Sequence, residues 1–331
     1  MAMLPHLATS AMPRPRHWAV TAWLVLAVTM APMVSVRPPS TTAPLASRVR
    51  LGAYVHLDGQ PYRDPVSTAD LTTLEDRVGR LDIVHYFFTW GRQFHEAVSP
   101  NLDGRDLMLS MQPDGDLVRQ IADGAQDGYL DRFAAQARAF GRPVYLRFGH
   151  EMNGEWMAYS AGRPGGPSAA AFVAAWRHLV ARFRAAGADN VRFVWSPNES
   201  DFPDRSGNRM EDYWPGTDVV DVAGFDAYNW STRSPRRGDG RDRSFEQIVA
   251  GPYRRLGRLT LKPVWLCEFG TVEPGKARWL RDMFGSRRFP RLQALIYFSE
   301  NDQRDVQRDW RLDTSAAAVA AWRDGRAARP R

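Results

Sequence analysis

Two short segments of the chain carry carboxylates in positions suited to acid and base chemistry. RFGHEMNGEW (147–156) places Glu151 directly after a strand-like run, and PVWLCEFG (263–270) places Glu268 near the end of another. A charged residue that finishes an apolar strand is costly to bury unless it is paired or used in chemistry. Glu151 and Glu268 are therefore the candidate catalytic residues.

Strand alternation predicts which side chains share a face with each glutamate. In the second segment it places Val264 and Leu266 on the face of Glu268, as an inward-facing row. In the first segment it places Arg147 on the face of Glu151, one layer below it. We expect Arg147 to help keep a neighbouring carboxylate ionised.

The elements that must position these residues repeat along the chain. Strand-like runs occupy 51–55, 81–88, 106–112, 143–149, 190–196, 219–228, 263–269 and 295–299. Helical periodicity is clearest at 169–186 and is expected near 68–79, 127–141, 244–257, 274–285 and 314–324. Eight strands that alternate with helices are typical of a (β/α)8 TIM barrel. An open doubly wound sheet is disfavoured, since LGAYVHLDGQ (51–60) lacks the G-x-G-x-x-G motif.

A barrel also predicts where the chemistry lies, because active sites of this fold form at the carboxyl ends of the strands. Polar residues occur at those ends: His150 and Glu151, Asn198, Asp226, Glu268, and Glu300. Strands four and seven face each other across such a mouth. Two carboxylates there suit hydrolysis of a glycosidic bond, and in a retaining enzyme they lie roughly 5 Å apart.

Aromatic and amide side chains at the same strand ends indicate a sugar ligand. Aromatic faces can cover the apolar faces of pyranose rings, and amides or carboxylates can bond their hydroxyl groups. The aromatic candidates are Trp90, Trp156, Trp195, Tyr228 and Trp230. The polar candidates are Asn153, Asn198, Asn229 and Asp226.

These residues resemble glycoside hydrolase family 26, whose members are mostly β-mannanases, with some β-1,3-xylanases and mixed-linkage glucanases. The resemblance rests on HEMNGEW (150–156) at the end of the fourth strand, CEFG (267–270) at the end of the seventh, and Tyr228 after the sixth. It spans about residues 50–325.

The resemblance implies a role for each matching residue. It makes Glu151 the general acid and base and Glu268 the nucleophile of a retaining endo-acting enzyme. It makes His150 and Trp156 substrate contacts, and Tyr228 the hydrogen-bond donor that orients Glu268. The implied substrate is a β-linked polysaccharide, with β-1,4-mannan first. No metal or organic cofactor is required by this chemistry.

Other functions stay open on the sequence. Mannanases of the family usually carry a tryptophan at the end of strand eight, where this chain reads YFSEN (297–301), so an endo-β-glucanase or a β-1,3-xylanase is an alternative. A non-catalytic polysaccharide-binding barrel is another. A zinc peptidase is disfavoured, because Gly154 stands where H-E-x-x-H requires the second histidine.

Several further polar residues have a structural interpretation. We expect Glu155 and Glu199 to lie in exposed loops, and His56 and His85 to be hydrogen-bonded structural histidines. Glu300, which follows the eighth strand, has sugar binding as its alternative role.

Composition excludes several classes of function. The chain has 331 residues, a formal net charge of +7 and 44 basic residues, but these are scattered and form no stripe for nucleic acid. The single cysteine, Cys267, excludes an internal disulfide framework, and we expect it to pack against a helix. We expect a monomer whose partner is a polysaccharide.

The N-terminal segment 1–47 is expected to direct export. Arg14, Arg16 and His17 precede an apolar run over 18–36, followed by a polar, proline-containing linker. A cleaved signal peptide and a retained membrane anchor are both consistent with this pattern. In either case we expect the catalytic domain to occupy 48–331 and to act outside the cytoplasm.

Overall fold

The structure is a computed structural model that describes residues 49–56, 68–98, 102–230, 242–302 and 308–328. All of these residues belong to one compact unit. The predicted signal or anchor segment, 1–47, lies outside the described residues. Within the part of the chain that is described, no helix is both long and apolar enough to cross a membrane.

Eight parallel strands close into a barrel in chain order. They are β1 (Arg50–His56), β2 (Ile83–Thr89), β3 (Asp106–Gln112), β4 (Val144–Phe148), β5 (Val191–Trp195), β6 (Val222–Asn229), β7 (Val264–Thr271) and β8 (Leu292–Asp302). Each strand pairs with its neighbour, and β1 also pairs with β8, from Arg50 opposite Ala294 to His56 opposite Glu300. This closure confirms the predicted (β/α)8 barrel.

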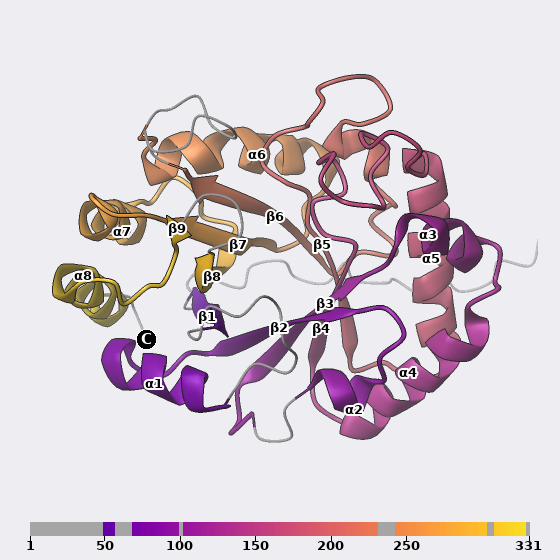
Figure 1. Cartoon of the computed structure of the whole chain (residues 1–331), viewed down its shortest axis with the longest axis horizontal. Coiled ribbons are helices and arrows are strands. Elements are labelled where there is room, and N and C mark those ends of the chain that lie inside the picture. Colours follow the sequence, from indigo (N-terminus) through magenta and orange to yellow (C-terminus); the bar gives the residue numbers. More distant parts are fainter. Residues whose placement is uncertain (1–48, 57–67, 99–101, 231–241, 303–307, 329–331) are drawn as a thin grey trace, which may run out of the picture. The chain divides into compact units, whose positions relative to one another are not determined.

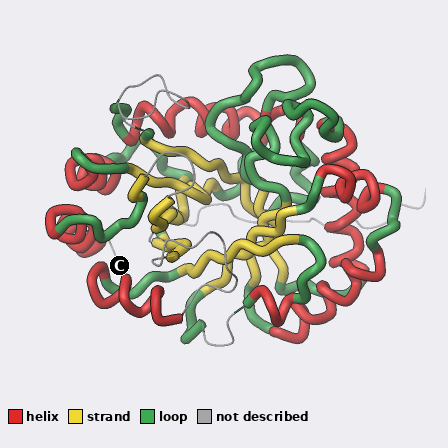
Figure 2. Tube along the Cα trace, viewed as in Figure 1, coloured by secondary structure: helices red, strands yellow, loops and turns green. Residues whose placement is uncertain are grey.

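Helices surround the strands, as the red and yellow segments of Figure 2 show. They are α1 (Thr68–Val78), α2 (Phe94–Ala97), α3 (Gly115–Ala122), α4 (Asp127–Phe140), α5 (Ala169–Ala185), α6 (Phe245–Leu259), α7 (Lys276–Gly285) and α8 (Ala316–Ala327). All six predicted helical ranges are helical, whereas α2 and α3 were not predicted. In Figure 1, α8 lies next to α1, so the helical ring closes where the barrel closes.

Local sequence explains where several helices begin and end. Ser168, Ser244 and Ser315 each precede a helix and accept a hydrogen bond from a backbone N–H of its first turn. Gly141 ends α4 in the left-handed conformation, which glycine adopts without a Cβ clash. Gly141, Ser168 and Ser244 thus fix the ends of helices that flank β4, β5 and β7, and Ser315 fixes the start of α8, which follows β8 and β9.

The inward face of β7 differs from the prediction. A cluster made only of strand residues fills the lower barrel interior, and it includes Trp265 and Cys267. Val264 and Leu266 instead join the core between the strands and the helices. Strict alternation therefore predicts the wrong face for this strand.

A β-bulge explains the difference. In the pairing of β6 with β7, Phe225 lies opposite Leu266 but Asp226 lies opposite Glu268, so Cys267 is an extra residue on β7. Cys267 and Glu268 consequently both turn inward, and Cys267 packs inside the barrel, not against a helix. Gly224 makes room for it, since a Cβ there would lie 2.3 Å from the Cys267 Sγ.

Two structures beyond the carboxyl ends of the strands carry further site residues. The β4–α5 and β5–β6 loops, the latter containing the short 3-10 helix η1 (Met210–Tyr213), meet at a bridge between Gly154 and Phe202. The short strand β9 (Arg308–Asp309) pairs antiparallel with the end of β8.

Candidate active site

The backbone after β4 turns sharply to present Glu151. Gly149 and Glu151 both have positive φ, 57° and 51°, and Glu151 is one of two non-glycine residues with positive φ in the described part of the chain. A left-handed glutamate is uncommon and is typical of functional sites. The Glu151 N–H donates to the Ser196 carbonyl at 2.8 Å, which ties this turn to the end of β5.

The Glu151 carboxyl group is held by two donors. Trp156 Nε1 donates to Oε2 at 2.6 Å, and Asn198 Nδ2 donates to Oε1 at 2.7 Å. The Trp156 ring lies over Gly154, where a Cβ would come within 2.3 Å of it, so the glycine permits this contact. Burial raises the pKa of Glu151 to about 7, and the charge of Glu268 adds to the increase. Glu151 thus holds a proton near neutral pH.

Glu268 has the opposite environment. Arg147 Nη2 donates to its Oε2 at 2.8 Å, and the Tyr228 hydroxyl donates to its Oε1. Both donors hold the carboxyl group in one orientation. Arg147 thus pairs with a carboxylate at the mouth of the barrel, and the partner is Glu268 at the end of β7.

A buried polar network supports Arg147 from below. Its Nη1 lies 2.8 Å from both oxygens of Asp226, and its Nε donates to Ser110 Oγ at 2.7 Å. Ser196 donates to Asp226 Oδ1 at 2.6 Å, and His85 Nε2 lies 2.7 Å from Ser110 Oγ. Although burial alone lowers the pKa of Arg147, Asp226 and Glu268 raise it above its usual value. The guanidinium is therefore a fixed positive charge beneath the site.

His150 lies beside the two carboxylates as a neutral ring. Burial lowers its pKa well below the usual value, and the charge of Arg147 lowers it further. Its ring approaches Phe87 with 5.4 Å between centroids, and within the described residues its buried Nδ1 has no hydrogen-bond partner.

Aromatic residues surround Tyr228 on the side of β9. Trp310 follows β9, and its ring centroid lies 4.9 Å from that of Tyr228. The Trp230 centroid lies 5.7 Å from that of Tyr228. The Arg308 Cζ lies 3.9 Å from the centroid of Trp230. The predicted sugar contact Trp230 is thus close to the site, with Arg308 over its ring.

Two other predicted aromatic contacts lie elsewhere. Trp195 is fully buried in the core between the strands and the helices. Its Nε1 donates to the Tyr213 carbonyl at 3.1 Å. Trp90 packs on Tyr129 of α4 and donates to Gln126 Oε1 at 3.3 Å. The expectation that Trp195 contacts sugar does not fit its position, because an outward-facing residue at a strand end meets the helical layer. Among the described residues, Trp90 forms no hydrogen bond or ring contact with Glu151 or Glu268.

Two predicted polar contacts are buried structural residues. Asn153 is fully buried; its Nδ2 donates to Asp201 Oδ1 at 2.8 Å, and its Oδ1 accepts from the Asn198 N–H at 2.8 Å. Asp226 is fully buried in the Arg147 network. Neither the Asn153 amide nor the Asp226 carboxylate is exposed to a ligand. Asn153 instead positions Asn198, and Asp226 positions Arg147. Asn229 is likewise buried, and it donates to Asp242 Oδ1 at 2.7 Å.

The remaining carboxylates have different surroundings. Glu155 is exposed, as predicted, but the Glu199 carboxyl is largely buried and forms a two-pronged ion pair with Arg243 at 2.6 and 2.9 Å. The arginine follows the β6–α6 loop, so it could not be paired with Glu199 from the sequence. Glu300 is buried at the end of β8, directly opposite His56 of β1.

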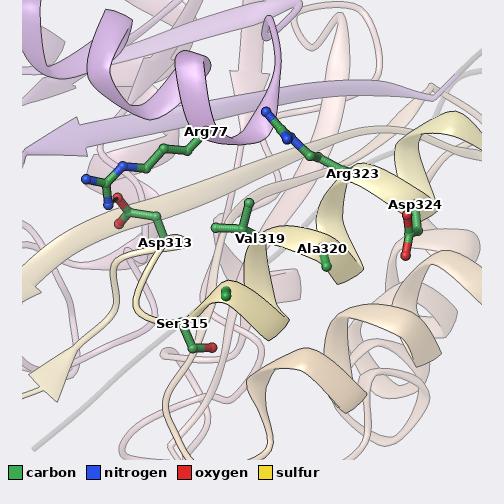
Figure 3. Close-up of a pocket in the computed structure, with 8 residues that line it drawn as sticks. Arg77, Asp313, Ser315, Val319, Ala320, Arg323 and Asp324 are labelled. Carbon is green, nitrogen blue, oxygen red and sulfur yellow. Dashed lines mark hydrogen bonds and ion pairs between the residues drawn. The ribbon is translucent and has the colours of Figure 1, made fainter.

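Other features of the described residues do not resemble a catalytic site. No group of three histidine, cysteine or acidic side chains there is arranged to hold a metal ion. A hollow of about 520 Å³ lies between α1 and α8, where Arg77 reaches Asp313 at 2.8 Å (Figure 3). Its remaining lining residues are Ser315, Ala316, Val319, Ala320, Arg323 and Asp324. It offers no pair of buried carboxylates.

A closed (β/α)8 barrel with two differently held carboxylates at the ends of β4 and β7 is an arrangement suited to hydrolysis of a glycosidic bond. Residues 117–254 match the model of glycosyl hydrolase family 26. Over 290 residues the chain is 32% identical to Endoglucanase H of Acetivibrio thermocellus, covering 84% of this chain. The chain is therefore similar to glycosyl hydrolase family 26 in sequence and in fold. The resemblance expected from the sequence motifs is confirmed.

Further similarities agree with the fold. A β-1,3-xylanase of Vibrio sp. is 28% identical over 38% of this chain. The catalytic domain of an endo-β-1,4-mannanase of Bacillus sp. has a TM-score of 0.60 at 17% identity, with 84% of this chain and 85% of that chain covered. A modular endo-β-1,4-mannanase of Cellulomonas fimi has a TM-score of 0.60 at 16% identity, with 86% and 71% covered. The chain spans 30% of the length of Endoglucanase H and 26% of that of the xylanase.

Sequence reasoning missed several residues of the site. Trp310 reaches Tyr228, and Arg308 reaches Trp230, because β8 continues into a hairpin with β9. The DWR run (309–311) was a weak signal of that return. Ser110 and Ser196 support Arg147 and Asp226 from other strands, which no local motif indicates. Phe202 was not singled out, although it stacks near Trp156.

Proposed function

We propose that this protein is a retaining endo-β-glycosidase with Glu268 as nucleophile and Glu151 as general acid and base. One observation carries the proposal: Glu268 accepts from Arg147 and Tyr228, while the pKa of the adjacent Glu151 is raised to about 7. A carboxyl group that holds a proton near neutral pH, beside a second carboxyl group oriented by two donors, is suited to these two roles.

The proposed reaction has two displacements. Glu268 attacks the anomeric carbon while the bond to the leaving oxygen breaks, and Glu151 gives its proton to that oxygen. The sugar is then bound to Glu268 as an ester. In the second step Glu151 takes a proton from water, the water oxygen attacks the anomeric carbon, and Glu268 leaves as a carboxylate. The two inversions retain the anomeric configuration.

The neighbouring residues support each step. Arg147 and Tyr228 donate to Glu268 and hold its carboxyl group in one orientation before the attack. Asn198 and Trp156 donate to Glu151, and these bonds strengthen when it becomes a carboxylate after proton transfer. His150 can bond a sugar hydroxyl through its neutral ring.

For the substrate we propose a β-linked glucan. The relative that matches over 84% of this chain at 32% identity bears the name endoglucanase. The end of β8 also departs from the tryptophan usual in the family's mannanases, since it reads Ser299-Glu300-Asn301. A β-1,4-mannan is the second candidate, favoured by HEMNGEW, and β-1,3-xylan is the third, favoured by the matching xylanase.

We further propose that the enzyme acts outside the cytoplasm. Arg14 and Arg16 followed by the apolar run 18–36 support export, and a polymeric substrate would be met there. Immunodetection of the full-length chain in culture medium and cell fractions tests this proposal. A chain found only in the cytoplasm would contradict it.

A reducing-end assay tests the proposed function. Purified protein is incubated with mixed-linkage β-glucan, β-1,4-mannan and β-1,3-xylan, beside the Glu151→Ala and Glu268→Ala variants and the exposed control Glu155→Ala. We expect new reducing ends from glucan with wild type and Glu155→Ala, and none above background with Glu268→Ala. A protein that binds a polysaccharide but releases no reducing ends would favour the non-catalytic alternative.

A further inference from the structure

One exposed aromatic residue packs near the indole ring that donates to Glu151. Among the described residues, the large hydrophobic side chains with high exposure are Phe202, 52% exposed, and Leu261, 89% exposed. Leu261 follows α6 at the amino-terminal end of the barrel. Phe202 instead lies in the β5–β6 loop, on the side of the mouth that carries Glu151. A single exposed hydrophobic residue does not by itself indicate a binding site. A role for Phe202 must therefore be supported by the residues around it.

Phe202 extends an aromatic surface that begins at Trp156. The two ring centroids lie 6.4 Å apart and the ring planes differ by 30°. Trp156 in turn donates to Glu151 Oε2 at 2.6 Å. The acid, the indole and the phenyl ring therefore follow one another from the mouth of the barrel outward into solvent.

The backbone around Phe202 is fixed by hydrogen bonds. Its N–H donates to the Asn153 carbonyl at 2.9 Å, and its carbonyl accepts from the Glu155 N–H at 2.8 Å. Asn208 Nδ2 bonds both the Asn153 and Pro203 carbonyls, at 3.0 and 2.9 Å. The buried Asn153 thus joins the two loops, and the phenyl ring is presented to solvent by a braced backbone.

The position of Glu151 indicates which part of the substrate would contact this surface. An acid that protonates the leaving oxygen lies beside the sugar that departs, whereas the nucleophile lies beside the sugar that stays. Trp156 and Phe202 are on the side of the acid, over β4 and β5. The Arg308, Trp230 and Trp310 group is on the side of the nucleophile, next to Tyr228.

We propose that Phe202 is a specificity-determining residue, which binds the apolar face of a pyranose on the leaving-group side, beyond the sugar that contacts Trp156. The inference rests on the proposed function. It implies a substrate with at least two sugars on that side of the cleaved bond. Binding energy gained there is expressed in the rate, because remote contacts help to orient the bond at the reacting centre.

The test compares substrates with and without sugars on the leaving-group side. Polymeric β-glucan occupies that side, whereas a β-cello-oligosaccharyl fluoride has only fluoride there. We expect Phe202→Ala to lower kcat/KM on the polymer about five- to tenfold, a typical effect of one lost aromatic contact, and to leave the fluoride unchanged. Phe202→Tyr restores the polymer rate, and Leu261→Ala, which truncates a still more exposed side chain far from the mouth, changes neither rate.

The outcomes separate this inference from the proposed function. Equal polymer rates for wild type and Phe202→Ala, or equal losses on both substrates, would overturn the role of Phe202 while leaving the glycosidase intact. A wild type that cleaves neither substrate would contradict the proposed function. In that case, retardation of Glu268→Ala and Glu268→Ala/Phe202→Ala in a β-glucan gel still tests Phe202. Unequal retardation supports it, and equal retardation contradicts it.

Discussion

Arg147 Nη2 donates to Glu268 Oε2 at 2.8 Å, from a guanidinium that is fully buried beneath the mouth of the barrel. The same guanidinium bonds both oxygens of Asp226. One positive charge thus serves two carboxylates, of which one faces the substrate and the other is enclosed. This relationship links the stability of the barrel to the orientation of the proposed nucleophile.

Replacement of Arg147 tests that link. We expect Arg147→Met to lower the free energy of unfolding by about 3–5 kcal/mol, because it leaves the fully buried Asp226 without a counter-charge. Arg147→Met/Asp226→Asn recovers part of this loss but not the activity, since Glu268 still lacks its donor. Urea unfolding and initial rates measure the two effects. A single variant within about 1 kcal/mol of wild type would contradict the account.

The pH dependence of activity tests the proton on Glu151. Its pKa of about 7 means that the acid form is present below that pH and is lost as the pH rises through it. We expect kcat/KM on the polymer to fall on the alkaline side with an apparent pKa near that value. Glu151→Ala, assayed with a glycosyl fluoride that needs no acid, lacks this alkaline limb. If the alkaline limb persists in the Glu151→Ala variant, it results from the ionisation of another group.

Trp156→Phe tests the hydrogen bond between the indole and Glu151. The bond stabilises the carboxylate, so it lowers the pKa that burial has raised. Its removal is expected to move the alkaline limb to higher pH while the aromatic ring keeps most of its stacking surface. A pH-rate profile with wild type as control measures the direction. An unchanged profile or a shift to lower pH would contradict the assignment.

Tyr228→Phe tests the second donor to Glu268. The variant keeps the ring that packs on Trp310 and removes only the hydroxyl that donates to Oε1. We expect kcat to fall on the order of 10²-fold, with a smaller change in KM, as for other donors aimed at a reacting group. The matched control is Trp195→Phe, whose buried indole donates to Tyr213 outside the mouth. That control should lose stability and keep KM. A larger change in KM for Trp195→Phe than for Tyr228→Phe would contradict the assignment of Tyr228 to the mouth and of Trp195 to the core outside it.

The barrel and the position of the two candidate carboxylates could be predicted from the sequence because their signals are local. Each strand is a short apolar run, and Glu151 and Glu268 lie at the ends of such runs, so the fold's rule for active sites was enough to place them at the mouth. The prediction failed where strict alternation was assumed. One bulge at Cys267 reversed the faces of Val264 and Leu266, and nothing in PVWLCEFG marks it.

The supporting residues could not be predicted because their contacts are distant in the sequence. Arg147 meets Asp226 and Glu268 only after strands four, six and seven come together in the closed barrel. Position at a strand end was also too coarse a criterion for Trp195. Whether such a side chain faces the mouth or the helices depends on how the strand pairs with its neighbours. That pairing cannot be read from the residue types at the strand end.

The central claim is that Glu268 forms the covalent bond to the sugar. A 2-deoxy-2-fluoro-β-cello-oligosaccharyl fluoride slows release of that bond, so the labelled enzyme can be digested and its peptides identified by mass spectrometry. We predict one added glycosyl group on the peptide containing Glu268, and none in Glu268→Ala. A label on any other residue, or none in an enzyme that cleaves the same glucan, would contradict the retaining mechanism proposed for this site.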